Sequence, residues 1–251
     1  MAETKGYAII TGASRGLGKA MFLQLASESY DLVGVYASEK SGAKMQALIE
    51  QVEKENGVKA AGIRADVGTV EGCQAIVDFA VKTFGTDISV LINNAGVAGG
   101  KYFEDEDLAN IARTINVDLM GALNLSSLVL PYMIERKGGD IISLSSIGAL
   151  AGVPGQCVYS TAKNGLIGFS KTLAKEVAKY NIKVNCIAPG VMETDMVAES
   201  DPQQRAATVA AIPMGRMGAP EEIALCASYI LKSNYLTGQT ISPNGGFVSI
   251  P

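Results

Sequence analysis

Short apolar runs alternate along the chain with longer segments in which apolar and polar residues recur at helical spacing. Six runs rich in β-branched residues are predicted to be strands, and a seventh is weaker: 7–10, 31–36, 58–65, 88–93, 140–145, 182–188 and 238–242. Because these runs are apolar almost without interruption, they are typical of a parallel sheet that is covered on both faces.

The longer segments between the runs are predicted to be helices, at 17–28, 41–56, 69–84, 105–136 and 156–180. The alternation of strand and helix predicts an α/β protein with a Rossmann-like, doubly wound fold: a seven-stranded, mainly parallel sheet with helices on both faces. No linker, repeat or low-complexity stretch interrupts the pattern, so residues 1–251 are expected to form a single dinucleotide-binding and catalytic domain. The one long irregular connection, 191–218, is expected to hold a short helix and to act as a lid.

The composition narrows the classes of function. The 251 residues carry a net charge of −4, which argues against nucleic acid as the main partner. The four cysteines stand far apart without a Cys-x-x-Cys pair, which predicts free thiols and no metal site. No apolar run reaches the roughly 18 residues of a membrane span, so we expect a cytoplasmic protein that does not bind a membrane. The chain has no His, so an enzyme with this sequence must move protons without imidazole.

The segment TGASRGLG (11–18) joins the first predicted strand to the first predicted helix. Its glycines, Gly12, Gly16 and Gly18, would allow a tight turn and a close approach of the backbone to a pyrophosphate at the helix N-terminus. Ser14 and Leu17 lie in the same turn and are predicted to contact the cofactor. The alternative is a glycine-rich turn without a ligand, but its place at the first strand–helix junction favours a dinucleotide site.

The end of the second strand distinguishes NADP from NAD. An acidic residue there would bind the ribose 2′-hydroxyl of NAD, but the chain has Ala37 and Ser38 after Tyr36. Arg15 in the glycine turn suits a 2′-phosphate, because a guanidinium matches phosphate geometry. Glu39 would oppose that phosphate if it turned inward, and Arg15 could also be a solvated turn residue. The stretch predicts NADPH/NADP⁺ as the cofactor.

Polar residues also follow the third and fourth strands. Asp66, followed by Val67, could accept a hydrogen bond from the adenine amino group, or Asp66 or Thr69 could cap the next helix. The segment NNAG (93–96) places Asn94, Ala95 and Gly96 where they could contact the cofactor ribose, or could simply join strand to loop.

Tyr159 and Lys163 are four residues apart and would lie on one face of a helix. A free tyrosine titrates near pH ~10. A neighbouring ammonium, together with a positively charged nicotinamide, would lower that pKa toward the working pH of an acid–base catalyst. Taken alone, the two residues could also be an ordinary pair on a helix surface.

Hydroxyl and amide side chains could complete the site. Ser146 ends the fifth strand, where ligands bind in such sheets, and could hold a substrate carbonyl beside the phenol. Ser145 is the competing candidate. Asn116 lies inside a long predicted helix, where asparagine is mildly unfavourable, so it is expected to have a local role, such as a water-bridged contact toward Lys163.

Together these motifs resemble the short-chain dehydrogenase/reductase family over essentially the whole chain. The matching pieces stand in the family's order: TGASRGLG, Asp66-Val67, NNAG, Asn116, Ser146, YSTAK (159–163) and APG (188–190). The resemblance implies that Ser146 orients a carbonyl and that Tyr159 protonates it. It implies further that Lys163 binds the nicotinamide ribose and lowers the pKa of the tyrosine, while Asn116 supports a proton-relay water. Pro189, Gly190, Met192 and Thr194 would flank the nicotinamide.

Four further segments resemble the 3-oxoacyl-acyl-carrier-protein reductases within that family: 165–178, 188–196, 212–224 and 235–246. This resemblance implies an NADPH-dependent reductase of 3-oxoacyl thioesters, with an acyl carrier protein or CoA as the carrier. The segment after NNAG is acidic and about two residues shorter than that pattern, in the region expected to meet the substrate. The alternatives are a reductase or dehydrogenase of another small alcohol–ketone pair, or a catalytically silent NAD(P)-sensing module.

A homotetramer is predicted separately, because the helices 105–136 and 156–180 carry extra apolar positions, of which one stripe would face the sheet and another a partner. These positions include Leu119, Leu123, Leu166, Phe169 and Leu173.

Overall fold

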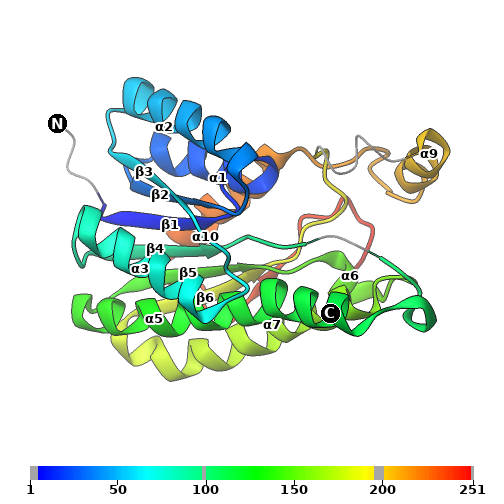
Figure 1. Ribbon diagram of the computed structural model, residues 1–251. Coiled ribbons are helices and arrows are strands. Elements are labelled where there is room, and N and C mark those ends of the chain that lie inside the picture. The colour runs from blue at the N-terminus through cyan, green and yellow to red at the C-terminus, as the bar shows by residue number, and fades with distance from the viewer. Residues whose placement is uncertain (1–4, 98–99, 195–200, 250–251) are drawn as a thin grey trace.

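The computed structural model describes residues 5–97, 100–194 and 201–249 (Figure 1). Seven strands form one sheet in the order β3-β2-β1-β4-β5-β6-β7, and every strand pair in it is parallel. The strands are β1 (Tyr7–Thr11), β2 (Asp31–Tyr36), β3 (Ala60–Arg64), β4 (Ile88–Asn93), β5 (Gly139–Leu144), β6 (Ile182–Ile187) and β7 (Thr240–Ile241). The predicted fold class is confirmed, and the third and seventh strands are shorter than predicted.

Helices cover both faces of the sheet (Figure 1). One face packs against α1 (Gly16–Ser27), α2 (Gly42–Asn56) and α10 (Pro220–Lys232), through a core that includes Phe22, Leu48 and Ile223. The other face packs against α3 (Val70–Phe84), α5 (Gly121–Arg136) and α7 (Cys157–Val177), through a core that includes Ile76 and Val129. The uninterrupted apolar strands therefore face two hydrophobic layers, as their sequences predict.

The helix predicted over 105–136 is divided. A 3₁₀ turn, η2 (Phe103–Asp105), precedes α4 (Leu108–Ile115), and a π-helical segment, η3 (Asn116–Met120), separates α4 from α5. In η3 the backbone N–H of Gly121 donates to the carbonyl of Asn116, five residues earlier. Such π-bulges are rare and are frequent at functional sites.

The run Leu108–Arg136 is long and apolar enough to cross a membrane by length and composition alone, with a mean hydropathy of 1.4 in its most apolar stretch. Leu125, Val129 and Met133 of this run are buried against the sheet and its neighbouring helices. The described contacts are those of a core helix.

Among the residues that the structure describes, three further α-helices lie outside the five predicted ones. α6 (Ile147–Ala151) follows β5, α9 (Pro202–Ala210) lies within the long connection, and α10 covers the sheet beside α1. In Figure 1, α9 stands apart from the layered body at the upper right. The short helix expected within 191–218 is therefore α9, and α10 is a helix that the sequence analysis missed.

Candidate active site

A cavity of about 980 Å³ lies at the carboxyl edge of the sheet. It spans the point where β1 has β2 on one side and β4 on the other, which is where ligands bind in doubly wound sheets. The predicted cofactor contacts that line it are Gly12, Ser14, Arg15, Gly16, Leu17, Ala37, Ser38, Asp66, Val67, Asn94, Ala95, Gly96, Tyr159, Lys163, Pro189, Gly190, Met192 and Thr194. Ser146 lines it as well. The structure therefore brings together residues from seven separate parts of the sequence.

The glycine turn leaves space that side chains would fill. Gly12 has φ +67°, and a Cβ there would lie 2.9 Å from Nδ2 of Asn94. Gly18 does not line the cavity in the described structure, but a Cβ on it would overlap the carbonyl oxygen of Gly12. The Arg15 side chain does not cap α1, and the first turn of α1 holds no acidic residue. The helix N-terminus is thus available to an anion.

Asn94 holds the glycine turn against β4. Its Nδ2 donates to the carbonyl oxygen of Thr11 at 2.8 Å, and its backbone N–H donates to the Thr11 hydroxyl at 2.9 Å. The neighbouring Asn93 donates to the Ser126 hydroxyl at 3.2 Å. The Asn94 amide therefore joins strand to loop, which was the alternative considered for NNAG, and Asn94 also lines the cavity, while Asn93 fastens β4 to α5.

Basic residues gather at the β2 end of the cavity. Arg15 is exposed there, and Lys40 and Lys44 line the same cavity. Glu39 forms an ion pair with Arg64 at 3.6 Å, and its side chain is 92% exposed. Arg15 was predicted from the sequence and the two lysines were not, although Lys40 stands two residues after Ser38 and Lys44 four residues after Lys40.

Asp66 and Thr69 divide the two roles proposed for them. The Thr69 hydroxyl accepts from the backbone N–H of Gly72 at 3.0 Å and so caps α3. An Asp66 carboxylate oxygen accepts from the N–H of Gly68 at 2.9 Å, and Asp66 remains exposed at the cavity. Its carboxylate is therefore accessible to a donor on a ligand.

The two candidate serines differ in their contacts. Ser145 is buried, and its hydroxyl donates to the carbonyl of Lys163 at 2.8 Å. The Ser146 hydroxyl accepts from the N–H of Gly148 at 3.0 Å and forms a hydrogen bond with Tyr159. Ser146 is thus the serine that faces the phenol, while Ser145 fastens β5 to α7.

Tyr159 and Lys163 lie together on α7, with Nζ of Lys163 5.6 Å from the centre of the tyrosine ring. Burial raises the pKa of Tyr159; the hydrogen bond with Ser146 lowers it, and the charge of Asp118 raises it. The lowering expected from the sequence required a positively charged nicotinamide as well, and the direction for the protein alone is upward. Lys163 is almost completely buried and donates to the carbonyl of Leu144 at 3.0 Å.

Asp118, which was not predicted from the sequence, lies beside Lys163, where Asn116 was expected. The Asn116 side chain is exposed, and among the described residues it is not part of the cavity lining. Asp118 is buried, and its Oδ2 lies 3.9 Å from Nζ of Lys163. Helical periodicity could have found it, because Asp118 falls on the same buried face as Thr114, Ala122 and Leu125.

The segment after β6 closes the cavity on the side expected for the nicotinamide. The carbonyl of Pro189 accepts from the N–H of Ile147, and the N–H of Gly190 donates to the carbonyl of Pro243 at 2.9 Å. Met192 pairs with Gly218 through a β-bridge. Residues 195–200 of the predicted lid lie outside the described residues.

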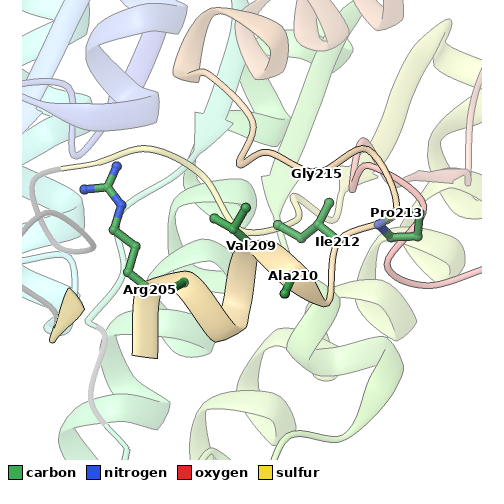
Figure 2. A pocket seen from close by; sticks show the side chains of 7 residues that line it. Arg205, Val209, Ala210, Ile212, Pro213 and Gly215 are labelled. Carbon is green, nitrogen blue, oxygen red and sulfur yellow. The ribbon is translucent and has the colours of Figure 1, made fainter. Parts of the chain in front are cut away.

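An open groove of about 770 Å³ lies beside α9 (Figure 2). Figure 2 shows Arg205 at one end and Pro213 at the other, with Val209 and Ile212 between them. Arg205 forms an ion pair with Glu193 at 3.5 Å. Because Glu193 stands between Met192 and Thr194, this ion pair links the groove to the segment that closes the cavity.

The residues present fit a dinucleotide. The backbone of the glycine turn cannot accept side chains at Gly12 and Gly18, and the N-terminus of α1 has no side-chain cap. A cavity of this size is in the range of cofactor sites, roughly 300–1,000 Å³. Gly12 and Gly16 would hold the pyrophosphate, Asp66 would meet the base, and Tyr159 and Lys163 would lie at the nicotinamide end.

Comparisons with known proteins agree with this geometry. The sequence model of the short chain dehydrogenase family matches residues 6–205. The 3-oxoacyl-[acyl-carrier-protein] reductase FabG of Thermotoga maritima is 36% identical over 242 residues, which are 96% of each chain. The protein of the same name from Aquifex aeolicus is 35% identical over 240 residues, which are 95% of each chain.

Solved structures of the same architecture cover nearly the whole chain. A blue fluorescent protein from a metagenomic library, in complex with NADPH, superposes with a TM-score of 0.92 at 28% identity, covering 98% of this chain and 99% of its own. A putative short-chain alcohol dehydrogenase from Sinorhizobium meliloti gives a TM-score of 0.90 at 30% identity, covering 98% and 97%.

Proposed function

This chain belongs to the short-chain dehydrogenase family, and from that premise we propose that it is an NADPH-dependent reductase of 3-oxoacyl thioesters. One observation carries the proposal: Tyr159, Ser146 and Lys163 meet at the wall of a dinucleotide-sized cavity. The curated relatives named 3-oxoacyl-[acyl-carrier-protein] reductase support the substrate class.

In the proposed mechanism Ser146 and Tyr159 act on the ketone oxygen. The Ser146 hydroxyl, held at the start of α6, donates a hydrogen bond that fixes the carbonyl beside the phenol. Tyr159 then donates its proton as the carbonyl is reduced, and its raised pKa keeps it in the protonated form that this step requires. The Lys163 ammonium stabilises the phenolate that is left behind. When bound, NADPH supplies the hydride.

NADPH is proposed over NADH because of the charges at the β2 end of the cavity. Arg15, Lys40 and Lys44 can neutralise a 2′-phosphate, whereas Glu39 is paired with Arg64 and is almost fully exposed. A dianionic phosphate gains from such charge-assisted contacts. An acidic residue that would repel it is absent from positions 36–38.

The acyl group is proposed to reach the cavity along the groove beside α9. Val209, Ile212 and Pro213 offer an apolar wall to an acyl chain, and Arg205 offers a cation at the end of the groove that its ion pair with Glu193 links to the cavity. We further propose that residues 191–213 close over bound substrate and exclude water. Acyl carrier protein or CoA would then remain outside, with only the acyl chain and thioester inside.

We also propose that the enzyme is a cytoplasmic homotetramer. Tyr102, Phe103 and Leu108 are exposed apolar residues near the start of α4, and Met120 in η3 is partly exposed. Leu166, one of the extra apolar positions behind this prediction, lies in the core of the chain. Light scattering at micromolar concentration tests the assembly, and a monomer mass would contradict it.

The decisive experiment is a steady-state assay of NADPH oxidation with acetoacetyl-CoA, acyl-carrier-protein thioesters and a panel of simple ketones. We expect thioesters to be reduced with the highest kcat/KM, and Tyr159→Phe to remove the activity. If the enzyme preferred another ketone, the proposed substrate class would be wrong, but the proposed reaction class would stand. Cofactor binding without turnover of any panel member would favour the sensing module.

A further inference from the structure

We propose that Asp118 is a positioning residue of the active site: its buried carboxylate is the counter-ion of Lys163 and keeps that lysine charged beside Tyr159. The inference rests on the proposed reductase function, because it concerns how the acid of that reaction is controlled. Asp118 lies in η3, the π-helical segment, and Lys163 lies in α7. Packing alone does not explain a carboxylate at position 118 or an ammonium at position 163.

The geometry isolates the two charges from solvent. The side chain of Asp118 is 0% exposed and that of Lys163 is 5% exposed, with Oδ2 and Nζ 3.9 Å apart. The other carboxylate oxygen, Oδ1, accepts from the backbone N–H of Val97 at 2.7 Å. Oδ2 has no hydrogen-bond partner among the described residues. A buried carboxylate oxygen without a partner is costly, and Lys163 is the cation that compensates it.

The backbone next to the ion pair leaves room for both side chains. A Cβ on Gly96 would lie 3.2 Å from Nζ of Lys163 and 3.3 Å from Oδ1 of Asp118, so a larger residue would crowd both. The π-bulge adds a residue to the helical turn, and Asp118 falls inside the bulged segment. The π-helical segment and a glycine, Gly96, therefore both lie beside this one buried ion pair.

Each group that faces the pair from the neighbouring elements bears on its charge. Burial lowers the pKa of Lys163, and the charge of Asp118 opposes this effect. Cys186 on β6 also faces Lys163, but burial raises the pKa of its thiol to about 11, so it remains neutral near pH 7. From α7, Tyr159 faces the pair, and Asp118 raises the pKa of its phenol. Asp118 is thus the only carboxylate among the described residues that offsets the burial of Lys163.

Removing the charge of Asp118 is expected to lower the pKa of both Lys163 and Tyr159. Ketone reduction needs the phenol protonated and the ammonium charged. Asp118→Asn should therefore move the basic limb of the pH profile of kcat/KM to lower pH, by about one unit or more. Asp140→Asn is the matched control, because Asp140 pairs with Lys183 at 3.0 Å far from the cavity, and its profile should not move. A basic limb unmoved in Asp118→Asn would overturn the proposal.

A second measurement needs no substrate. Without its counter-ion, the charged form of Lys163 destabilises the folded protein near neutral pH. The pKa of Lys163 in the folded protein therefore falls below its pKa in the unfolded chain. The unfolded chain then binds more protons, so the stability of Asp118→Asn should recover relative to wild type as pH rises from about 7 toward about 10. In Asp118→Asn/Lys163→Met the recovery should disappear, because the lysine is gone.

These two readouts separate the inference from the proposed function. If no substrate is reduced, urea denaturation across pH still decides the role of Asp118. A stability loss that stays constant with pH in Asp118→Asn would contradict the proposal. Should that variant fail to fold, a folded double variant would support an uncompensated ammonium as the cause, and a double variant that is equally unfolded would contradict it.

Discussion

Two aspartate–lysine pairs lie at opposite ends of the same sheet, one almost fully buried and the other partly buried, and they differ in how the donors of their lysines are used. At the amino end, Asp140 of β5 lies beside Lys183 of β6, with Oδ1 and Nζ 3.0 Å apart. Lys183 also donates to the carbonyls of Ile230, Leu231 and Ser233 at the end of α10. This ammonium joins three elements, and its donors are fully used.

At the carboxyl end, the partners of Lys163 are fewer. Nζ donates to the carbonyl of Leu144 and lies 3.9 Å from Asp118, and these are its described polar contacts. An ammonium has three donors, so Lys163 retains hydrogen-bonding capacity at the wall of the cavity. The difference teaches that a lysine whose three donors all have partners fastens the fold, whereas a lysine with unused donors next to a cavity is available for chemistry.

The largest effect should come from the carboxyl end. Tyr159→Phe keeps the ring but removes the proton donor, so kcat should fall by at least about 10²-fold. The free energy of unfolding should change little, because the hydroxyl faces the cavity. Steady-state kinetics and urea denaturation of the same preparation check both halves. Turnover above roughly a tenth of wild type would reject Tyr159 as the acid.

The amino end should give the opposite result. Lys183→Met leaves Asp140 and the carbonyls at the end of α10 without their cation, which should cost about 3–5 kcal/mol of stability. Activity per folded molecule should be unchanged. A specific loss of kcat in folded protein would break the contrast between the two ends.

The loss of stability in Lys183→Met should also depend on pH in a defined direction. Burial raises the pKa of Asp140 to about 6 in the folded protein. Its folded state therefore binds more protons than the unfolded chain between about pH 4 and pH 6, and its contribution to stability falls as pH rises through that window. Without Lys183 the pKa rises further. The stability loss of the variant should be largest above pH ~6 and should shrink as pH falls, which urea denaturation at several pH values can measure.

The fold followed closely from the sequence because apolar runs and glycine turns are local signals. The strands β1, β2, β4, β5 and β6 lie where the pattern predicts them. α10 was missed although Pro220 at its first turn and two acidic residues after it are ordinary start signals. The division of the long helix depends on one shifted backbone hydrogen bond, from Gly121 to Asn116, which side-chain periodicity does not encode.

The site could be predicted from the sequence for residues whose position is set by the carboxyl end of a strand. Arg15 and Ser146 lie at the cavity because the carboxyl ends of parallel strands meet at one edge, and Tyr159 reaches the same edge from the first turn of α7. Asn116 was chosen for its residue type within a helix, and the structure turns it to solvent. Asp118 was overlooked because a charged residue on an apolar face is easily taken for a helix surface, and only the packing of α7 against η3 reveals its partner.

A smaller effect is expected at the mouth of the cavity. Arg15→Ala should remove one charge-assisted contact to the 2′-phosphate, worth roughly 1.5–3 kcal/mol. The KM for NADPH should then rise by about tenfold to a hundredfold, with little change for NADH. Arg136→Ala is the matched control, since Arg136 pairs with Asp87 at the amino end. Equal or better use of NADH by wild type would reject the role of Arg15 and make Glu39 the residue to test.

The smallest effect should come from a surface pair at the amino end. Arg136 and Asp87 lie 2.6 Å apart, but the Asp87 side chain is 61% exposed and that of Arg136 is 33% exposed. Solvent screens such pairs, so Asp87→Asn should cost about 0.2–1 kcal/mol, and less at high salt. Chemical denaturation at low and high ionic strength measures this loss. If it approached the loss in Lys183→Met, exposed charges would stabilise the amino end as much as the buried pair does. The saturation of Lys183 would then no longer explain the difference between the two ends of the sheet.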